Sequence, residues 1–145
     1  RFGFSSEGGT RDFTQTEAAM ELLLPWRKTW DSGWQLETRL DFSAGILHAR
    51  DDHAAILTLG PCVQIGRGGF PVVLDLGVSP TMLASDRVGG RDFGRHFQFT
   101  SHAGLLWEIH GMVRLGYRYQ HMSNASLGDH NPGLNLHMFT LGFRF

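Results

Sequence analysis

The sequence predicts an all-β protein, specifically an eight-stranded antiparallel transmembrane β-barrel. Apolar and polar residues alternate with a period of two along most of the chain, which is typical of strands with one apolar face. The alternating segments run for about 11 to 15 residues, longer than the strands of about 5–6 residues in a soluble sandwich and long enough for a tilted membrane crossing. No stretch of about 18 uninterrupted apolar residues is present, so the sequence excludes a transmembrane helix.

Chain length, charge and cysteine content limit the alternatives. The 145 residues predict a single domain, residues 1–145, because a second core of useful size has no room. The formal net charge of −1 and the scattered positions of the 13 Lys and Arg residues exclude a nucleic-acid partner. The single cysteine, Cys62, excludes an internal disulfide framework and is interpreted as a small apolar residue within a strand. No signal peptide is visible, so an exported protein would be the cleaved, mature form.

Four strands are expected in the first half of the chain. The opening stretch 1–6 is the shortest, and segment 20–26 follows with Met, Leu, Leu and Trp at its even positions. Segment 34–46 has large apolar residues at even positions and charged residues at several odd ones. Segment 54–66 reverses this parity, with aliphatic residues at odd positions and polar residues or glycine at several even ones. Each segment therefore has one apolar and one polar face.

Four more strands are expected in the second half. Large apolar residues take the even positions in segment 69–83 and the odd positions in segments 95–109 and 111–123. The last segment, 139–145, has Phe, Leu, Phe and Phe at its odd positions, and its terminal Phe145 resembles the C-terminal strand signal of bacterial outer-membrane proteins. The total of eight suits a barrel whose interior is filled by side chains without an open channel.

The polar face of each strand is expected to point into the barrel, because the apolar face must contact lipid. Charges of both signs occur on this face, and internal ion pairs explain them better than catalysis does. The set comprises Glu37, Arg39, Asp41, Asp75, Glu108, Arg114, Arg118 and Arg144.

Connection lengths orient the barrel. Residues 66–69 and 110–111 form tight turns, whereas 85–94 and 125–134 are longer and rich in Gly, Asp and Asn. Outer-membrane barrels have short periplasmic turns and longer outer loops, so both termini are expected on the periplasmic side. Segment 111–123 then ends near the outer leaflet. Aromatic residues near strand ends are expected in the interfacial belt, namely Trp26, Trp34, Tyr117 and Tyr119.

A histidine and a serine stand two residues apart at the outer end of segment 111–123. His121 and Ser123 share the parity of the apolar residues, so both are expected on the lipid-facing surface. Their Cα atoms would lie roughly 6.5–7 Å apart, within reach of a side-chain hydrogen bond. An imidazole that takes the serine proton as the hydroxyl attacks an ester is the centre of nucleophilic acyl transfer, and Asn124 is the nearest oxyanion donor. Such a pair also occurs for structural reasons, and its lipid-facing position favours the catalytic interpretation.

The segment H-M-S-N-A-S-L, residues 121–127, and the segment N-P-G-L-N, residues 131–135, resemble the motif region of the PagL family of lipid A 3-O-deacylases. The resemblance covers the chain from Val113 to the C-terminus, and the earlier strands match in architecture only. It implies an outer-membrane barrel that hydrolyses the ester-linked acyl chain at the 3-position of lipid A. By position, His121 would be the general base, Ser123 the nucleophile, and Asn124 with the backbone N–H of Ser126 the oxyanion hole.

The sequence departs from the family pattern at one position. Where a family glutamate orients the histidine, this chain has Asn135, which shares the outward parity of Phe139. The amide carbonyl can accept the Nδ1–H hydrogen bond and fix the tautomer, but it supplies no charge to the imidazolium, so activity can be reduced. Asp129 in the neighbouring loop is a second choice for this role. Asp129 and His130 also suggest a metal site, but the eight histidines are dispersed, so no metal is predicted.

Two functional classes remain. The first is a serine-type esterase of the bacterial outer membrane that acts on lipid A or lipopolysaccharide, without a cofactor, among outer-membrane lipids; a homodimer stays open. The second is a non-catalytic small outer-membrane barrel that serves membrane integrity or adhesion, which would favour longer outer loops than these. A barrel that transfers an acyl chain to an acceptor is a third alternative, whose acyl-accepting pocket the sequence cannot reveal.

Overall fold

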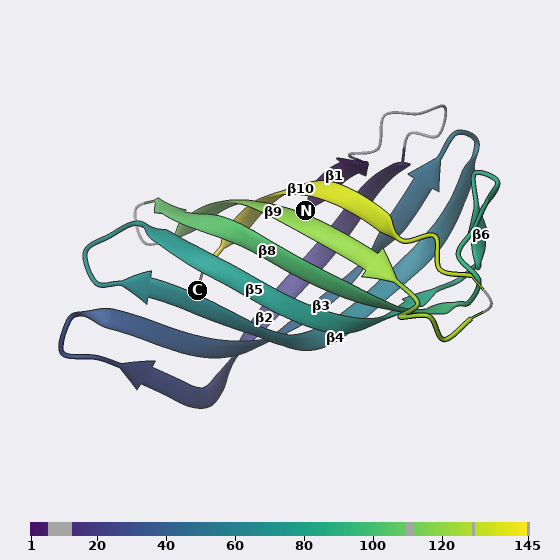
Figure 1. Ribbon diagram of the computed structural model, residues 1–145. Coiled ribbons are helices and arrows are strands. Elements are labelled where there is room, and N and C mark those ends of the chain that lie inside the picture. Colours follow the sequence, from purple (N-terminus) through teal and green to yellow (C-terminus); the bar gives the residue numbers. More distant parts are fainter. Residues whose placement is uncertain (6–12, 110–111, 129, 145) are drawn as a thin grey trace.

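The computed structural model describes residues 1–5, 13–109, 112–128 and 130–144 (Figure 1). Within them, eight antiparallel strands close into a barrel in the order β1-β10-β9-β8-β5-β4-β3-β2, which confirms the predicted fold class. The strands are β1 (Phe2–Ser5), β2 (Phe13–Thr29), β3 (Trp34–Ala49), β4 (Asp52–Arg67), β5 (Val72–Leu83), β8 (Phe97–Ile109), β9 (Val113–Ser123) and β10 (Leu134–Phe143). No helix among these residues is long and apolar enough to cross a membrane.

The short strand β1 completes the ring. Phe2 pairs with Phe139 of β10 on one side and with Thr16 of β2 on the other. Both edges of the sheet are thereby paired, as a barrel in lipid requires, because an unpaired backbone group in hydrocarbon costs several kcal/mol. The predicted tight turn at residues 110–111 and the predicted terminal strand residue Phe145 lie outside the described part of the chain.

Two strands are longer than the alternation predicted. β2 begins at Phe13 rather than near residue 20, and β10 begins at Leu134 rather than at residue 139. The added residues of β10 include Leu134, Leu136 and Met138, which are apolar yet point into the barrel and are fully buried. In this part of β10 the alternation is reversed, because the apolar residues point inward and Asn135 and His137 take the outward positions, so a search for apolar residues on the outward parity misses it.

The outward face is apolar along the strands. Large apolar side chains on the predicted outward parity remain exposed, including Phe42, Leu57, Leu59, Leu105, Trp107, Tyr117, Tyr119, Phe139 and Leu141. So much exposed apolar surface would be unfavourable in water and suits contact with acyl chains. The predicted outward orientation of these strands is therefore confirmed.

The inner half of the lumen holds the predicted ion pairs. Arg118 contacts Glu17 at 2.9 Å and Asp41 at 3.2 Å, and Asp41 also accepts hydrogen bonds from the Arg1 guanidinium. Nearer the inner end, Arg114 lies 2.6 Å from Glu108. These side chains fill the lumen with paired charges of opposite sign, which offsets the cost of removing them from water.

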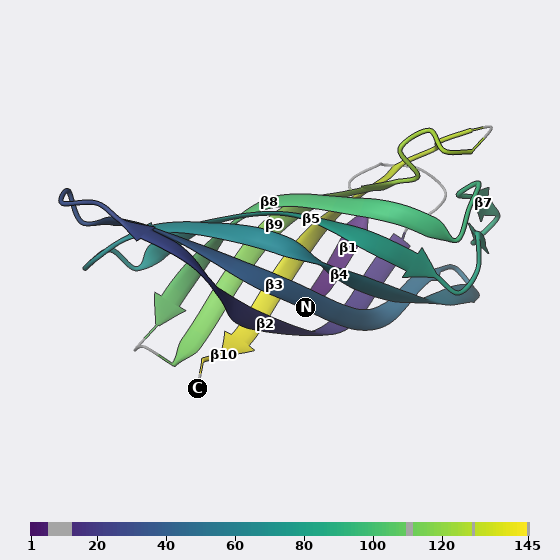
Figure 2. The ribbon, with the colours of Figure 1, turned by 90° about the horizontal axis from the view of Figure 1, so that it is seen from below.

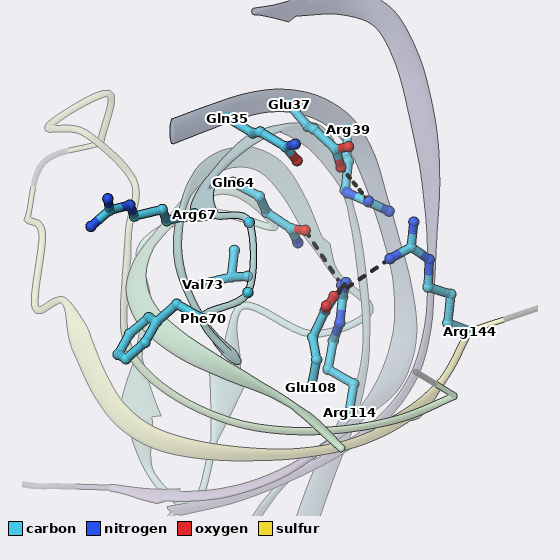
Figure 3. Close-up of a pocket in the computed structure, with 13 residues that line it drawn as sticks. Gln35, Glu37, Arg39, Gln64, Arg67, Phe70, Val73, Glu108, Arg114 and Arg144 are labelled. Carbon is cyan, nitrogen blue, oxygen red and sulfur yellow. Dashed lines mark hydrogen bonds and ion pairs between the residues drawn. The ribbon is translucent and has the colours of Figure 1, made fainter. Parts of the chain in front are cut away.

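Arg144 departs from the predicted set. Its side chain is 58% exposed and reaches only 3.6 Å from Glu108, because it follows the last residue of β10 at the open inner end. There it lines a cavity of about 200 Å³ together with Arg39, Gln64 and Arg114 (Figure 3).

The outer half of the lumen contains a buried apolar cluster beside polar residues such as Gln98, which corrects the expectation of a uniformly polar interior. Two members, Val88 and Phe93, come from the connection between β5 and β8, where β6 (Arg87–Val88) and β7 (Arg91–Asp92) form a small hairpin. The hairpin covers this end of the barrel (Figures 1 and 2), so the inward residues beneath it are shielded from water. The strand members are Phe13, Leu47, Ala49, Ala54, Ile56, Leu83, Met122, Leu134, Leu136 and Met138.

We predict that Asp41→Ala destabilises the barrel by about 3–5 kcal/mol, because it leaves the buried Arg118 and Arg1 guanidinium groups short of a partner. Thermal unfolding in detergent, followed by circular dichroism, measures the loss. Glu37→Ala is the matched control, since Glu37 is partly exposed and pairs with Arg39 near the inner end. Equal melting temperatures for the two variants would contradict the central role of Asp41.

Candidate active site

The predicted catalytic residues come together on the outer surface where β9 ends and β10 begins. His121 of β9 is the direct register partner of Asn135 of β10, and Ser123 is the partner of Phe99 on β8. His121 is exposed, and Ser123 and Asn135 are half-buried. All three point away from the lumen, because their neighbours Met122 and Leu134 point into it and are buried. The parity argument for a lipid-facing site is therefore confirmed.

A hydrogen bond orients the imidazole. His121 Nδ1 lies 2.7 Å from Asn135 Oδ1, and with the amide oxygen as acceptor the Nδ1 nitrogen carries the proton. The lone pair of Nε2 is then available to a hydroxyl, as a general base requires. Among the described residues, no hydrogen bond joins His121 to Ser123 and none joins His121 to a carboxylate. Asp129, the second choice for the orienting role, lies outside the described residues.

Gly133 supports the other edge of the imidazole. A Cβ built on this glycine would lie 2.9 Å from His121 Cε1 and 3.6 Å from His121 Nε2, and its φ of +23° lies outside the usual range for L-residues. The first distance is shorter than a normal van der Waals contact, so a larger residue would displace the ring. Gly133 and Asn135 thus hold His121 from the same strand end, and sequence reasoning had not singled out Gly133.

The residues after Ser123 form a tight turn. The Leu127 N–H donates to the Asn124 carbonyl at 3.0 Å, and the two residues between them, Ala125 and Ser126, have φ values of 51° and 61°. Non-glycine residues in this left-handed region each cost on the order of 1–2 kcal/mol. Two in succession require strong support from neighbouring groups, and such strain is frequent at functional sites.

Asn124 supplies that support. Its side chain is fully buried, its amide nitrogen donates to the carbonyls of Phe93 and His130, and its Oδ1 accepts the backbone N–H of Ser126 at 2.9 Å. The two predicted oxyanion donors, the Asn124 amide and the Ser126 N–H, are thus both used within the loop. Their oxyanion role requires these bonds to rearrange on substrate binding, and it stays a prediction.

Arg91 of the outer hairpin fixes the start of β10. Its guanidinium donates to the carbonyls of Pro132 and Gly133 and lies 5.8 Å from the ring centroids of both Phe13 and Phe93. This contact ties the hairpin to the glycine that touches His121. Sequence reasoning missed Arg91, because no local pattern links residue 91 to residue 133.

Asp92 strengthens the same hairpin. The backbone N–H of Gly94, followed by the Arg87 guanidinium, holds the pKa of the Asp92 carboxyl below its usual value. The carboxylate therefore stays charged at neutral pH and can pair with Arg87 at 2.9 Å and with His130 at 3.4 Å. His130 belongs to the connection between β9 and β10, so the contact between His130 and Asp92 is a second link between hairpin and site.

A second hydroxyl also lies close to His121. Ser101 of β8 is the direct register partner of His121, and it is exposed on the same outward face. Sequence reasoning missed this serine, because strand pairing rather than chain order brings it to the site. Register partners on one face have Cβ atoms about 4.5–5.5 Å apart, so Ser101 is a rival nucleophile by position.

The described residues contain no group of three or more His, Cys, Asp or Glu side chains arranged to hold a metal ion. His130 is within this part of the chain, whereas Asp129 is outside it. The described side chains at the site are an imidazole, two hydroxyl groups and side-chain amides.

Comparison with known proteins links this chain to one family. The family described as lipid A 3-O-deacylase (PagL) matches residues 14–144. The lipid A deacylase PagL of Bordetella bronchiseptica is 33% identical over 72 residues, which are 50% of this chain and 40% of that relative. The matched region thus spans less than half the length of that relative. A crystal structure of the outer membrane enzyme PagL has the same fold, with a TM-score of 0.83 at 16% identity over 99% of this chain and 97% of that one.

We predict that Gly133→Ala displaces the His121 ring, because the new methyl group would overlap Cε1. The Nδ1–Asn135 hydrogen bond should weaken, and the imidazole nitrogen resonances of His121 in an NMR spectrum of the labelled protein should shift toward a mixture of tautomers. The control is Gly69→Ala in the inner turn, where a Cβ meets nothing within 4 Å. His121 signals that stay unchanged in Gly133→Ala would refute the supporting role of Gly133.

Proposed function

Because the chain belongs to the PagL family of lipid A 3-O-deacylases, we propose that it removes the ester-linked 3-position acyl chain of lipid A. The reaction takes place in the outer leaflet of a bacterial outer membrane, with lipid A or lipopolysaccharide as substrate. One observation carries this proposal: His121, oriented by Asn135, lies two residues from Ser123 on the lipid-facing surface. A lipid ester can reach such a site without leaving the membrane.

Acylation begins with Ser123. Its Oγ bonds to the ester carbonyl carbon while His121 Nε2 takes the hydroxyl proton, and the carbonyl oxygen becomes the oxyanion of a tetrahedral intermediate. The bond between the acyl carbon and the sugar 3-oxygen then breaks as the carbonyl re-forms, and the imidazolium returns the proton to the departing 3-oxygen. The products of this half-reaction are the 3-hydroxyl form of lipid A and an acyl ester on Ser123.

Water completes the cycle. His121 Nε2 takes a proton from water as the water oxygen attacks the acyl ester, and Ser123 Oγ leaves with that proton. The fatty acid is released into the leaflet. The outward position of the site favours this step, because the exposed His121 lies near the headgroup level, where water is present.

The oxyanion would be stabilised by the turn that follows Ser123. The backbone N–H of Ser126 and the side chain of Asn124 are the proposed donors, each after exchanging its present partner for the oxyanion. Support for this part of the proposal is the strained conformation of Ala125 and Ser126, which such an exchange could relax.

Asn135 takes the place of the family glutamate in this proposal. It accepts the Nδ1–H hydrogen bond and so selects the tautomer that Ser123 needs. Without a negative charge it stabilises the imidazolium less than a carboxylate would. The second candidate function is a non-catalytic barrel. The observation that favours it is the neutral amide of Asn135 at the position of the family glutamate.

We predict that Ser123→Ala and His121→Ala each lower deacylation below detection while the barrel stays folded, because both side chains lie outside the packed lumen. Mass spectrometry of lipid A incubated with the refolded protein measures the loss of one acyl chain, and heat-dependent gel mobility checks folding. Ser101→Ala is the matched control, since it removes the same hydroxyl from the neighbouring strand. Activity that survives Ser123→Ala but not Ser101→Ala would reassign the nucleophile.

We predict a smaller effect at Asn135. Asn135→Ala removes the acceptor for Nδ1–H, and its rate should fall by roughly a hundredfold, less than for Ser123→Ala. Asn135→Glu should act at least as fast as the unchanged protein, because a carboxylate both orients the ring and stabilises its charged form. Initial rates of fatty acid release compare the three proteins. An Asn135→Glu protein slower than Asn135→Ala would show that the position does not orient His121.

A further inference from the structure

An open hollow lies at the outer rim, beside the candidate active site. Its volume is about 490 Å³, and it is lined by Asp86, Gly94, Arg95, His96, Phe97 and Gly128. Most of these residues come from the connection between β5 and β8, and Gly128 comes from the connection between β9 and β10. The hollow is therefore bounded by the same two connections that support the site.

The register of β8 places this hollow outward of Ser123. Phe99 is the register partner of Ser123, and Phe97, one step further out on the same face, packs edge-on against Phe99 at 5.1 Å between ring centroids. Two residues along a strand correspond to about 7 Å. In an outer leaflet the headgroup of a lipid lies outward of its ester bonds. A lipid whose ester is at Ser123 thus has its headgroup at the level of Phe97 and the hollow.

Arg95 gives the hollow a positive charge. The Arg95 side chain is exposed, and its guanidinium makes no hydrogen bond or ion pair among the described residues. Its stem runs along Gly128, where a Cβ would lie 3.6 Å from Arg95 Cγ and Nε. The buried Gln98 fixes its backbone by donating to the Arg95 carbonyl at 2.6 Å. A guanidinium with free donors on such a fixed backbone is suited to bidentate binding of phosphate.

His96 and Asp86 add hydrogen-bond acceptors to the hollow. His96 Nδ1 lies 2.9 Å from the Leu83 carbonyl and donates to it, and the Leu83 N–H donates to the His96 carbonyl at 2.8 Å. His96 Nε2 and the Asp86 carboxylate are then acceptors for sugar hydroxyl or amide N–H groups. Asp86 would repel a small free anion in the same hollow. A phosphorylated sugar satisfies both charges, and Phe97 offers an apolar face to the sugar ring.

We infer that this hollow binds the phosphorylated sugar headgroup of the lipid whose ester reaches Ser123, with Arg95 pairing with a phosphate group. The inference rests on the proposed function, since it names the part of the same substrate that the hollow recognises. Arg95 is here a binding residue and takes no part in bond breaking. Its contribution should appear in the KM for the substrate rather than in kcat, because it contacts the substrate and transition state alike.

The test compares lipid A carrying its phosphate groups with the same lipid after removal of phosphate, both in mixed detergent micelles. We expect Arg95→Gln to raise KM for the phosphorylated lipid by roughly tenfold, the value of one charge-assisted hydrogen bond, with kcat unchanged. KM for the phosphate-free lipid should not change. Arg67→Gln is the control, because it removes the same charge from an exposed residue at the inner end.

A binding measurement separates this inference from the catalytic one. Fluorescence titration of both lipids with Ser123→Ala protein, with and without Arg95→Gln, should give the same roughly tenfold contrast in Kd. A contrast in Kd without any hydrolysis by the unchanged protein would overturn the proposed function and leave the headgroup site standing. Equal effects of Arg95→Gln on both lipids, or no effect on either, would overturn the headgroup site. Competition by millimolar inorganic phosphate alone would also overturn it, in favour of a free-anion site.

Discussion

Backbone pairing between β9 and β10 determines which side chains can meet at the site. Because His121 and Asn135 are register partners, their side chains leave the sheet on the same face and are held at hydrogen-bond distance. A slip of one residue would turn one of them into the lumen. The closed ring prevents such a slip, since every neighbouring strand is paired on both sides and the buried Leu134 and Met122 fix the opposite face.

The loops around the site pack against the buried apolar cluster in the outer half of the lumen. Phe93 belongs to this cluster, accepts a hydrogen bond from the Asn124 amide, and stacks beneath the Arg91 guanidinium. Through Arg91 it is linked to Gly133, and through Asn124 to the strained turn after Ser123. The site thus stands on packed apolar contacts and buried hydrogen bonds, although its reactive groups lie on the outside of the barrel. Rigid support of this kind is what holds a left-handed turn of Ala125 and Ser126 in place.

Sequence reasoning reached most strands, their outward faces, His121 and Ser123, because these follow from parity along a strand, and it reached Asn135 through the resemblance to the family motif. It failed where contacts depend on closure of the barrel. Ser101, Arg91 and Gly133 reach the site from other strands and loops, and no local pattern marks them. The start of β10 was missed for a related reason, since its inward residues join the buried apolar cluster and the alternation there is reversed. For Asn124 the sequence predicted a hydrogen-bonding role, but it could not predict that the side chain is buried and bonded within the loop.

An amide at position 135 changes what the site can do with charge. A carboxylate there would be costly in a lipid-facing position whenever His121 is neutral, because removing an ionised group from water is unfavourable without a close counter-charge. An amide avoids that cost, and it still selects the Nδ1–H tautomer through a 2.7 Å hydrogen bond. In the proposed reaction, water and lipid headgroups near the exposed His121 would then have to stabilise the imidazolium. The rate of that reaction should therefore depend on how polar the surrounding leaflet is at the level of His121.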